Sequence, residues 1–286
     1  SPFATIAKLE VGYQISKMTM ADEMGNNLLA LAKNGAESMV ADLDEAKIIT
    51  DIIATSGGGG IRGSLLTTLY LIVLTLVIAL PLGICAAIYL HEFAKQNQFT
   101  HIIRTMIDIT TGIPSIIFGL VGAIVFIPMM NKTIQSSGGS IASGALTLTI
   151  ILLPTIIKTT EESLKAIPNS YRMASLALGA SKSQTTFKVI LPNAVFGILT
   201  ATLLSIGRII GESAALIYAV GTAIKDSVAI NEKSTSLAVH IWSLMGGENP
   251  NYELSCAISI IILLIVGLVS LGVKLISRTI NKTEVK

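Results

Sequence analysis

Charged side chains are scarce in this sequence. Asp, Glu, Lys and Arg make up 13% of its 286 residues, where a soluble domain has about 25%. Hydrophobic residues make up 51%, and the mean hydropathy is +0.72. These values exclude an ordinary soluble domain and indicate an all-α, polytopic protein of the lipid bilayer. The net charge of only +2, with basic residues dispersed along the chain, also excludes a nucleic-acid groove.

Motifs for metal, nucleotide and enzyme chemistry are also missing. Cys85 and Cys256 lie in apolar runs without a CxxC or Cys/His neighbour, so we expect small buried packing residues. His91, His101 and His240 show no HExxH spacing, and no Ser/His/Asp set lies at one depth. The stretch SGGGGIRGS has no GKS or GKT ending, so it is a flexible linker and not a nucleotide loop. We therefore expect no metal site and no catalytic residues in this chain.

Five apolar segments have close to the roughly 20 residues that cross a bilayer as a helix. Because lipid cannot satisfy backbone polar groups, each segment should be helical. The segments are Leu65–Leu90, Ile109–Met130, Ile141–Ile157, Phe196–Val220 and Leu254–Ile276.

The loops differ in basic residues, which are enriched on the cytoplasmic side of a membrane. His91–Met106, Lys158–Val195 and Lys274–Lys286 together hold eleven Lys and Arg residues, whereas Asn131–Ser140 and Gly221–Glu253 hold three. We therefore expect the first three segments, and the C-terminus, to be cytoplasmic.

Five spans with an internal C-terminus place the start of the chain outside. We expect an extracytoplasmic segment with its Gly-rich linker over residues 1–63, and a transmembrane domain over residues 64–286. The chain begins with Ser and shows no signal peptide. An exported N-terminal segment then needs an upstream span, so we expect a first transmembrane helix that this sequence lacks.

Two full charges interrupt the apolar stretch LLSIGRIIGESAALIYAVG. Arg208 and Glu212 are four residues apart, which predicts an ion pair on one helix face that Ser205 joins. Arg208 should lie near the bilayer centre, where such residues usually face a water-filled path. A guanidinium on a pathway suits an oxyanion, and Glu212 could orient it and soften its field. The alternative is a buried ion pair that only locks helix packing.

Glycine and proline mark further features of the spans. Gly207 and Gly211 form a GxxxG pair, which predicts close packing of a second helix. Pro81, Pro114 and Pro154 lie in or at the edge of spans and predict kinks. Pro114 could open a helix whose N–H groups face an anion, but we favour a simple proline in the first helical position.

The loop of residues 158–195 predicts two short helices. Pro168 marks the start of the first, Gly179 suits its end, and Ser181 with Gln184 forms a capping box for the second. Pro192-Asn193 should end the second helix. Tyr171, Ala174 and Leu178 share one face of the first helix, which would offer an apolar surface to a partner. An amphipathic loop lying on the membrane is the alternative.

The stretch MASLALGASKSQTTFKVILP resembles the signature loop of bacterial ABC-importer permeases. Ala174, Gly179, Leu191 and Pro192 match the family pattern, and Ser175 stands in place of its second Ala. Met173 stands where the family has Glu. The resemblance implies that Tyr171, Ala174, Ser175, Leu178, Gly179, Leu191 and Pro192 belong to a coupling helix that docks on an ATPase subunit.

Further segments, TTGIPSIIFGL, LPTIIKTTEESLKAIPNSYR and IGRIIGESAALIYAVG, are similar to the A-type permease of the phosphate-specific importer. The resemblance implies a permease core in the bacterial inner membrane that imports phosphate, with Arg208, Glu212 and Ser205 on the pathway. It implies as partners a second related permease, an ATPase dimer that binds ATP and Mg, and an extracytoplasmic phosphate-binding protein. A permease for sulfate or molybdate, and a secondary anion carrier, remain alternatives.

Overall fold

The computed structural model describes residues 60–286 except 96, 137, 227, 247–249 and 284–286. The chain divides into two units, Ser1–Gly59 and Gly60–Lys286, and the description below concerns the second. The expected extracytoplasmic segment falls on residues outside the described part, so that segment and its boundary at residue 63 stay predictions.

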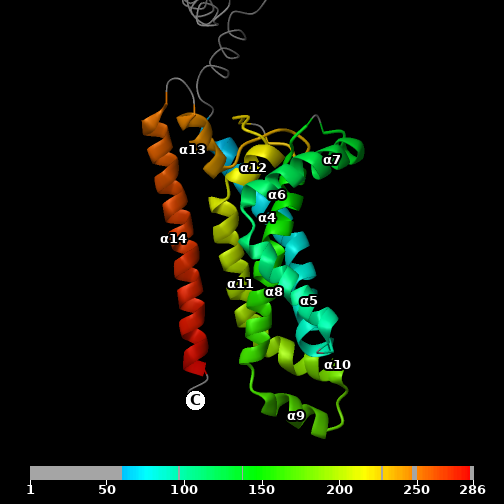
Figure 1. The fold of residues 1–286 in the computed structure, drawn as a ribbon. Coiled ribbons are helices and arrows are strands. Elements are labelled where there is room, and N and C mark those ends of the chain that lie inside the picture. The colour runs from blue at the N-terminus through cyan, green and yellow to red at the C-terminus, as the bar shows by residue number, and fades with distance from the viewer. Residues whose placement is uncertain (1–59, 96, 137, 227, 247–249, 284–286) are drawn as a thin grey trace, which may run out of the picture. The chain divides into compact units, whose positions relative to one another are not determined.

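Helices make up the described part, and no strand occurs among its residues. Short π-helical turns, named η1 to η3, end α4 (η1) or join α6 to α7 (η2) and α10 to α11 (η3). In chain order the elements (Figure 1) are α4 (Ile61–Ile88), η1 (Tyr89–Phe93), α5 (Gln98–Gly112), α6 (Ser115–Val121), η2 (Gly122–Phe126), α7 (Ile127–Ile134), α8 (Ile141–Ala166), α9 (Asn169–Ala177), α10 (Lys182–Thr185), η3 (Thr186–Ile190), α11 (Leu191–Gly211), α12 (Ala214–Ala219), α13 (Leu237–Met245) and α14 (Tyr252–Thr283).

Among the residues that the structure describes, five helices are long and apolar enough to cross a membrane, as the sequence predicted. They are Ile61–Phe93, Ser115–Ile134, Ile141–Ala166, Lys182–Gly211 and Tyr252–Gly272.

Several predicted boundaries are wrong: the second span starts at Ser115 and not at Ile109, and the fourth ends at Gly211 and not at Val220. The expected loop His91–Met106 is largely helix, because Asn97 caps α5 by accepting a hydrogen bond from the Thr100 N–H at 2.9 Å. The fourth span starts at Lys182 and not at Phe196, because the π-helical turn η3 directly before Leu191 lets the helix continue through Pro192.

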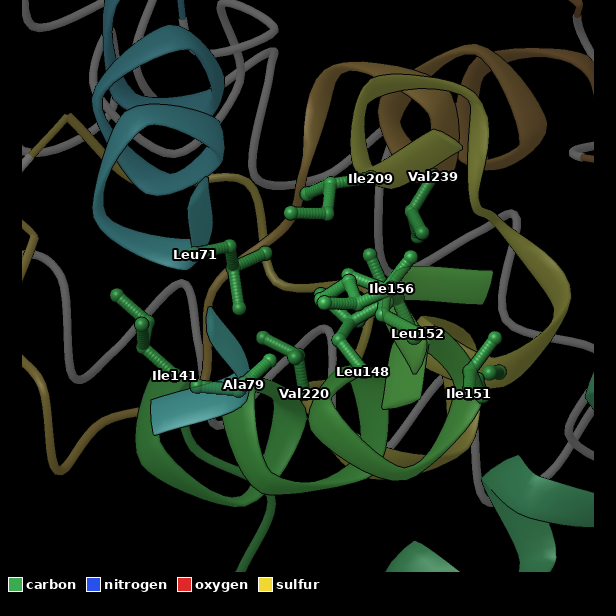
Figure 2. Packing of buried hydrophobic residues seen from close by; sticks show 13 residues of the cluster. Leu71, Ala79, Ile141, Leu148, Ile151, Leu152, Ile156, Ile209, Val220 and Val239 are labelled. Carbon is green, nitrogen blue, oxygen red and sulfur yellow. The ribbon is translucent and has the colours of Figure 1, made fainter. Parts of the chain in front are cut away.

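The helix α8 is the centre of the bundle. In its most apolar window 67% of the residues are buried, against 11% in Tyr252–Gly272. Figure 2 shows Leu148, Leu152 and Ile156 of α8 packed with Leu71 of α4 and Ile209 of α11. Lipid is as apolar as these side chains, so close fit rather than escape from water holds them together.

Glycines allow neighbouring helices to approach α8 closely. A Cβ on Gly83 of α4 would lie 2.6 Å from the Ile156 Cγ2 atom, so a larger residue there would require Ile156 to shift. Gly83 follows Pro81 by two residues, and Ile156 follows Pro154 by two. Of the three prolines expected to kink spans, Pro81 and Pro154 are therefore inside helices and at one level of the bundle.

The two cysteines are free and exposed, which corrects the expectation that they are buried. Cys85 lies on α4 and Cys256 on α14, both inside candidate spans. Apolar character does not separate the interior of a membrane bundle from its lipid-facing surface, so hydropathy alone could not show which side they face.

Candidate functional site

The charged stretch is broken, not a single helix. Arg208 lies in the last turn of α11, which ends at Gly211, and Glu212 follows in extended backbone with φ −76° and ψ 121°. The Glu212 carboxylate accepts a hydrogen bond from the Ala215 N–H at 3.2 Å. An acidic side chain at the N-terminus of a helix satisfies a free donor and the helix dipole. Glu212 therefore stabilises the start of α12.

Arg208 has a partner on α8 instead. Its Nη1 atom donates to the Thr155 hydroxyl at 3.1 Å, and the side chain remains exposed. No ion pair joins Arg208 and Glu212, both of which the structure describes. The predicted ion pair is therefore wrong, because spacing by four residues brings side chains together only while the helix continues, and this helix ends between them.

Ser205 does not lie beside Arg208 on an open face. It is fully buried, and its hydroxyl donates to the Ala201 carbonyl of its own helix at 2.8 Å. A hydroxyl satisfied in this way needs no other partner. The structure brings Arg208 and Thr155 together and leaves Ser205 in the packed interior.

Open space borders Arg208. A Cβ added at Gly207 or Gly211, in the same helix, would meet no atom within 4 Å. The close helix packing predicted for the GxxxG pair is therefore wrong within this chain. Near this stretch a close glycine contact is made instead by Gly119 of α6, whose added Cβ would lie 2.7 Å from the Ala215 Cα atom.

A second break lies between α5 and α6. Pro114 precedes the first residue of α6, with φ −58° and ψ 135°, rather than occupying the first helical position as we favoured. A residue before proline is pushed to extended backbone, and Ile113 is extended with ψ 131°. The chain is thus interrupted twice, at Ile113–Pro114 and at Glu212–Ser213, and α6 and α12 pack on each other beyond the breaks.

A charged cavity of about 320 Å³ lies between α5 and α8. Two ion pairs line it: Lys158 Nζ lies 2.6 Å from Asp108 Oδ1, and Arg104 Nη2 lies 3.2 Å from Glu161 Oε1. Lys158 also approaches the Thr111 hydroxyl at 3.5 Å. Sequence reasoning missed this cluster, because it assigned Lys158 only to the cytoplasmic boundary and gave Asp108 no role.

The loop after α8 has the predicted helical punctuation. Gly179 ends α9 in left-handed backbone at φ +82°, and Ser181 with Gln184 forms the capping box that opens α10. The Ser175 hydroxyl lies 2.9 Å from the Thr185 hydroxyl, which ties α9 to α10. Pro192 does not end the second helix, since α10, η3 and α11 form one continuous span.

The apolar residues of α9 are uncovered. Tyr171 is 50% exposed and Leu178 is 90% exposed, and Ala174 between them is exposed as well. Met173, at the position of the family Glu, is 62% exposed. Leu191 is half-buried at the start of α11, so the loop's last matching residues belong to the span and not to this surface.

Arg172 holds α9 against the bundle. Its guanidinium donates to Glu92 Oε1 at 2.7 Å and to the carbonyls of Leu164 and Ile167 at 3.0 and 3.1 Å. The carbonyls belong to the end of α8, where helix acceptors lack partners. One side chain thus joins α9 to both α8 and the end of the first span.

Comparison with known proteins gives the family. The model of the family described as binding-protein-dependent transport system inner membrane component matches residues 79–282. The chain is 33% identical over 218 residues to a probable ABC transporter permease protein YqgI of Bacillus subtilis (strain 168), covering 72% of each protein. It is 37% identical over 163 residues to the phosphate transport system permease protein PstA of Yersinia pestis, covering 57% of this chain and 53% of that protein.

Solved structures agree on the fold. A chain of the MetNI methionine ABC transporter in an inward facing conformation has a TM-score of 0.58 at 23% identity, covering 77% of this chain and 94% of that one. The broken helices, the five candidate spans and the family match together lead to one assignment. This chain belongs to the family of binding-protein-dependent transport system inner membrane components, the permeases of ABC importers.

Proposed function

We propose that this chain is the permease subunit of an ATP-driven importer of inorganic phosphate, with Arg208 contacting the anion. The observation that carries the proposal is the exposed guanidinium of Arg208 on α11. It binds the neutral hydroxyl of Thr155, halfway along α8, and open space borders it. The names of relatives support the choice of anion, since the Yersinia pestis protein is a phosphate transport system permease.

The charge of Arg208 explains why an anion would enter. A guanidinium inside a membrane span is costly, by about 3 to above 10 kcal/mol at the bilayer centre, unless water or a counter-charge reaches it. Glu212 does not supply that charge, because its carboxylate is bound to the backbone of α12. A phosphate oxyanion would, and Arg binds such groups through two parallel N–H donors. Thr155 fixes one end of the guanidinium and so orients it.

The surface of α9 suits the coupling to an ATPase. Tyr171, Ala174 and Leu178 are exposed on a helix whose Arg172 is joined to α8 and to the end of the first span. Movement of α9 by a partner would therefore be transmitted to the helices around Arg208. In this proposal ATP and Mg bind to a separate ATPase dimer, and this chain carries no catalytic residue.

The remaining partners follow from the same proposal. A second, related permease would form the other half of the pathway, and an extracytoplasmic binding protein would deliver phosphate. The protein would lie in the bacterial inner membrane with its C-terminus in the cytoplasm. Figure 1 supports a common side for the coupling surface and the C-terminus, because α9, α10 and the end of α14 lie at one end of the bundle.

Uptake of labelled phosphate by the complete transporter tests the proposal. Arg208→Gln should abolish uptake while the ATPase still co-purifies, and Arg208→Lys should retain part of it because a point charge replaces the fork. Excess sulfate or molybdate should not compete. Normal uptake in Arg208→Gln would show that the arginine is structural, and competition by sulfate would assign another oxyanion.

A further inference from the structure

The cavity between α5 and α8 begins about one turn along α8 from Thr155, the residue that binds Arg208 of α11. Thr155, which binds Arg208, and Lys158, which lines the cavity, are three residues apart on α8. Three residues rise by about 4.5 Å, close to one helical turn, so the two side chains leave α8 on the same face. Lys158 is the nearer of the two to α9, because α8 runs toward α9 (Figure 1).

The cavity holds balanced charges. Arg104, Lys158 and Lys165 face Asp108, Glu161 and Glu162, so the formal charges cancel. At Arg104 or Lys158, each of which is paired with a carboxylate, an anion can bind only by displacing that carboxylate.

The two ion pairs of the cavity differ in how easily they can open. Arg104 and Glu161 have side chains that are 27% and 10% exposed, and Arg104 also donates to the Leu90 carbonyl at 2.9 Å. Lys158 and Asp108 are 36% and 65% exposed. An exposed pair contributes little to stability, whereas a half-buried pair with a further hydrogen bond holds the fold. The Lys158–Asp108 pair is therefore the one that can exchange partners.

The surroundings of Lys158 leave room for an oxyanion. The Thr111 hydroxyl lies 3.5 Å from its Nζ atom, and Gly112, the next residue, faces open space. Lys158 thus donates to a threonine hydroxyl, and Arg208 does the same with Thr155. Two cation–hydroxyl pairs thus follow each other along one face of α8.

We propose that Lys158 is a second phosphate contact, which the anion reaches after Arg208 on the side toward α9. Asp108 competes with the anion for Lys158. Phosphate passing from Arg208 displaces the Asp108 carboxylate, and the carboxylate returns to Lys158 as the anion leaves. The returning carboxylate speeds release and keeps the site from trapping phosphate. The inference rests on the proposed function, because it assumes that the anion reaches Arg208.

Phosphate uptake by the assembled transporter separates this role from a structural one. Lys158→Gln should lower uptake by at least roughly tenfold, as expected for losing a charge-assisted hydrogen bond, and Lys158→Arg should restore most of it. Asp108→Asn should lower KM and Vmax together, since the anion then meets no competitor. Lys132→Gln removes the same charge from an exposed position on α7 that does not line the cavity, and should leave uptake unchanged.

The outcomes are distinct. Equal losses in Lys158→Gln and Asp108→Asn, with KM unchanged, would overturn the proposal, because a structural pair is damaged alike from either side. Normal uptake in Lys158→Gln would overturn it as well. If Lys158→Gln fails to assemble, Asp108→Asn, which keeps the lysine, decides by its KM. Failure of the proposed function is recognised separately, by wild-type protein that does not transport phosphate or by an Arg208→Gln variant that does.

Discussion

At the scale of single residues, Glu212 caps the start of α12, and this predicts the effect of replacing it. Its carboxylate binds the Ala215 N–H, which an amide oxygen can also do. Glu212→Gln should therefore keep phosphate uptake within about twofold of wild type, whereas Glu212→Leu should lose about 1 kcal/mol of stability with the cap. Uptake and thermal unfolding of the purified transporter measure the two effects. A complete loss of uptake in Glu212→Gln would instead support an electrostatic role for the charge.

His240 gives a prediction of pH dependence. Its ring is fully buried, and its Nδ1 lies 2.6 Å from the Ser64 hydroxyl. Burial lowers the pKa of His240 below its ordinary 6.5. As pH falls below 6.5 the unfolded chain takes up this proton before the folded one does, so stability is full above 6.5 and declines below it.

The measurement is thermal unfolding of the complete transporter at about pH 7.5 and about pH 5. His240→Asn should reduce the difference in Tm between the two conditions. His101→Asn is the control, because His101 is exposed and should leave the difference unchanged. An equal Tm shift in wild type and His240→Asn would show that other groups cause the acid sensitivity.

Single residues were found from the sequence where they are chemically rare, and missed where they are common. Arg208 stood out because a charge inside an apolar run is costly. Its partner Thr155 could not be found, since a hydroxyl in an apolar span has many structural uses and lies 53 residues away. Lys158 was hidden for the opposite reason, because lysines at span ends usually report only orientation.

At the scale of elements, the turn between α9 and α10 offers the clearest prediction. Gly179 adopts φ +82°, where an L side chain is strained, and an added Cβ there would meet no atom within 4 Å. Gly179→Ala therefore tests backbone strain alone. The strain should raise the free energy of the turn by about 1 kcal/mol, which lowers the population of the turn roughly fivefold. We expect weaker stimulation of the ATPase by phosphate-loaded binding protein.

Gly179→Asn is the matched control, because Asn tolerates left-handed backbone. It should retain more ATPase stimulation than Gly179→Ala although its side chain is larger. The reverse order would mean that space at the partner surface, and not the turn's geometry, is what Gly179 provides.

Element boundaries were predictable where caps mark them and unpredictable where helices continue through a stop signal. Pro168, Gly179 and Ser181 lie where the sequence expected them. Pro192 was taken as an end, but a proline near a helix start can equally be absorbed into a longer helix through a π-helical turn. The break at Glu212 had no proline at all, and its neighbouring glycine was interpreted as a packing contact.

For the whole molecule, the family and the five spans followed from hydropathy and motifs, while the faces of the helices did not. The Arg208 face, the exposed cysteines and the charged cavity depend on which side of each helix the neighbours cover. In a membrane bundle both sides are apolar, so the sequence contains little information about that choice.

Sidedness is the last prediction, and the structure makes it simple to test. The end of the bundle with α9 and α10 is opposite the end with α12 and α13 (Figure 1). The basic residues expected in the cytoplasm include Lys182 on α10, whereas Lys225 before α13 belongs to the side with few basic residues. In a background with Cys85→Ser and Cys256→Ser, exposed Asp226→Cys should react with a membrane-impermeant maleimide on intact cells.

Ser183→Cys, exposed on α10, should react only after the cells are opened. Labelling of both positions in opened cells controls for reactivity, and phosphate uptake by both variants shows that the fold is retained. The reverse pattern would place α9 outside the cell, where no ATP is available. In that case Tyr171 and Leu178 could not dock on an ATPase, and their exposed surface would have to meet an extracytoplasmic partner instead.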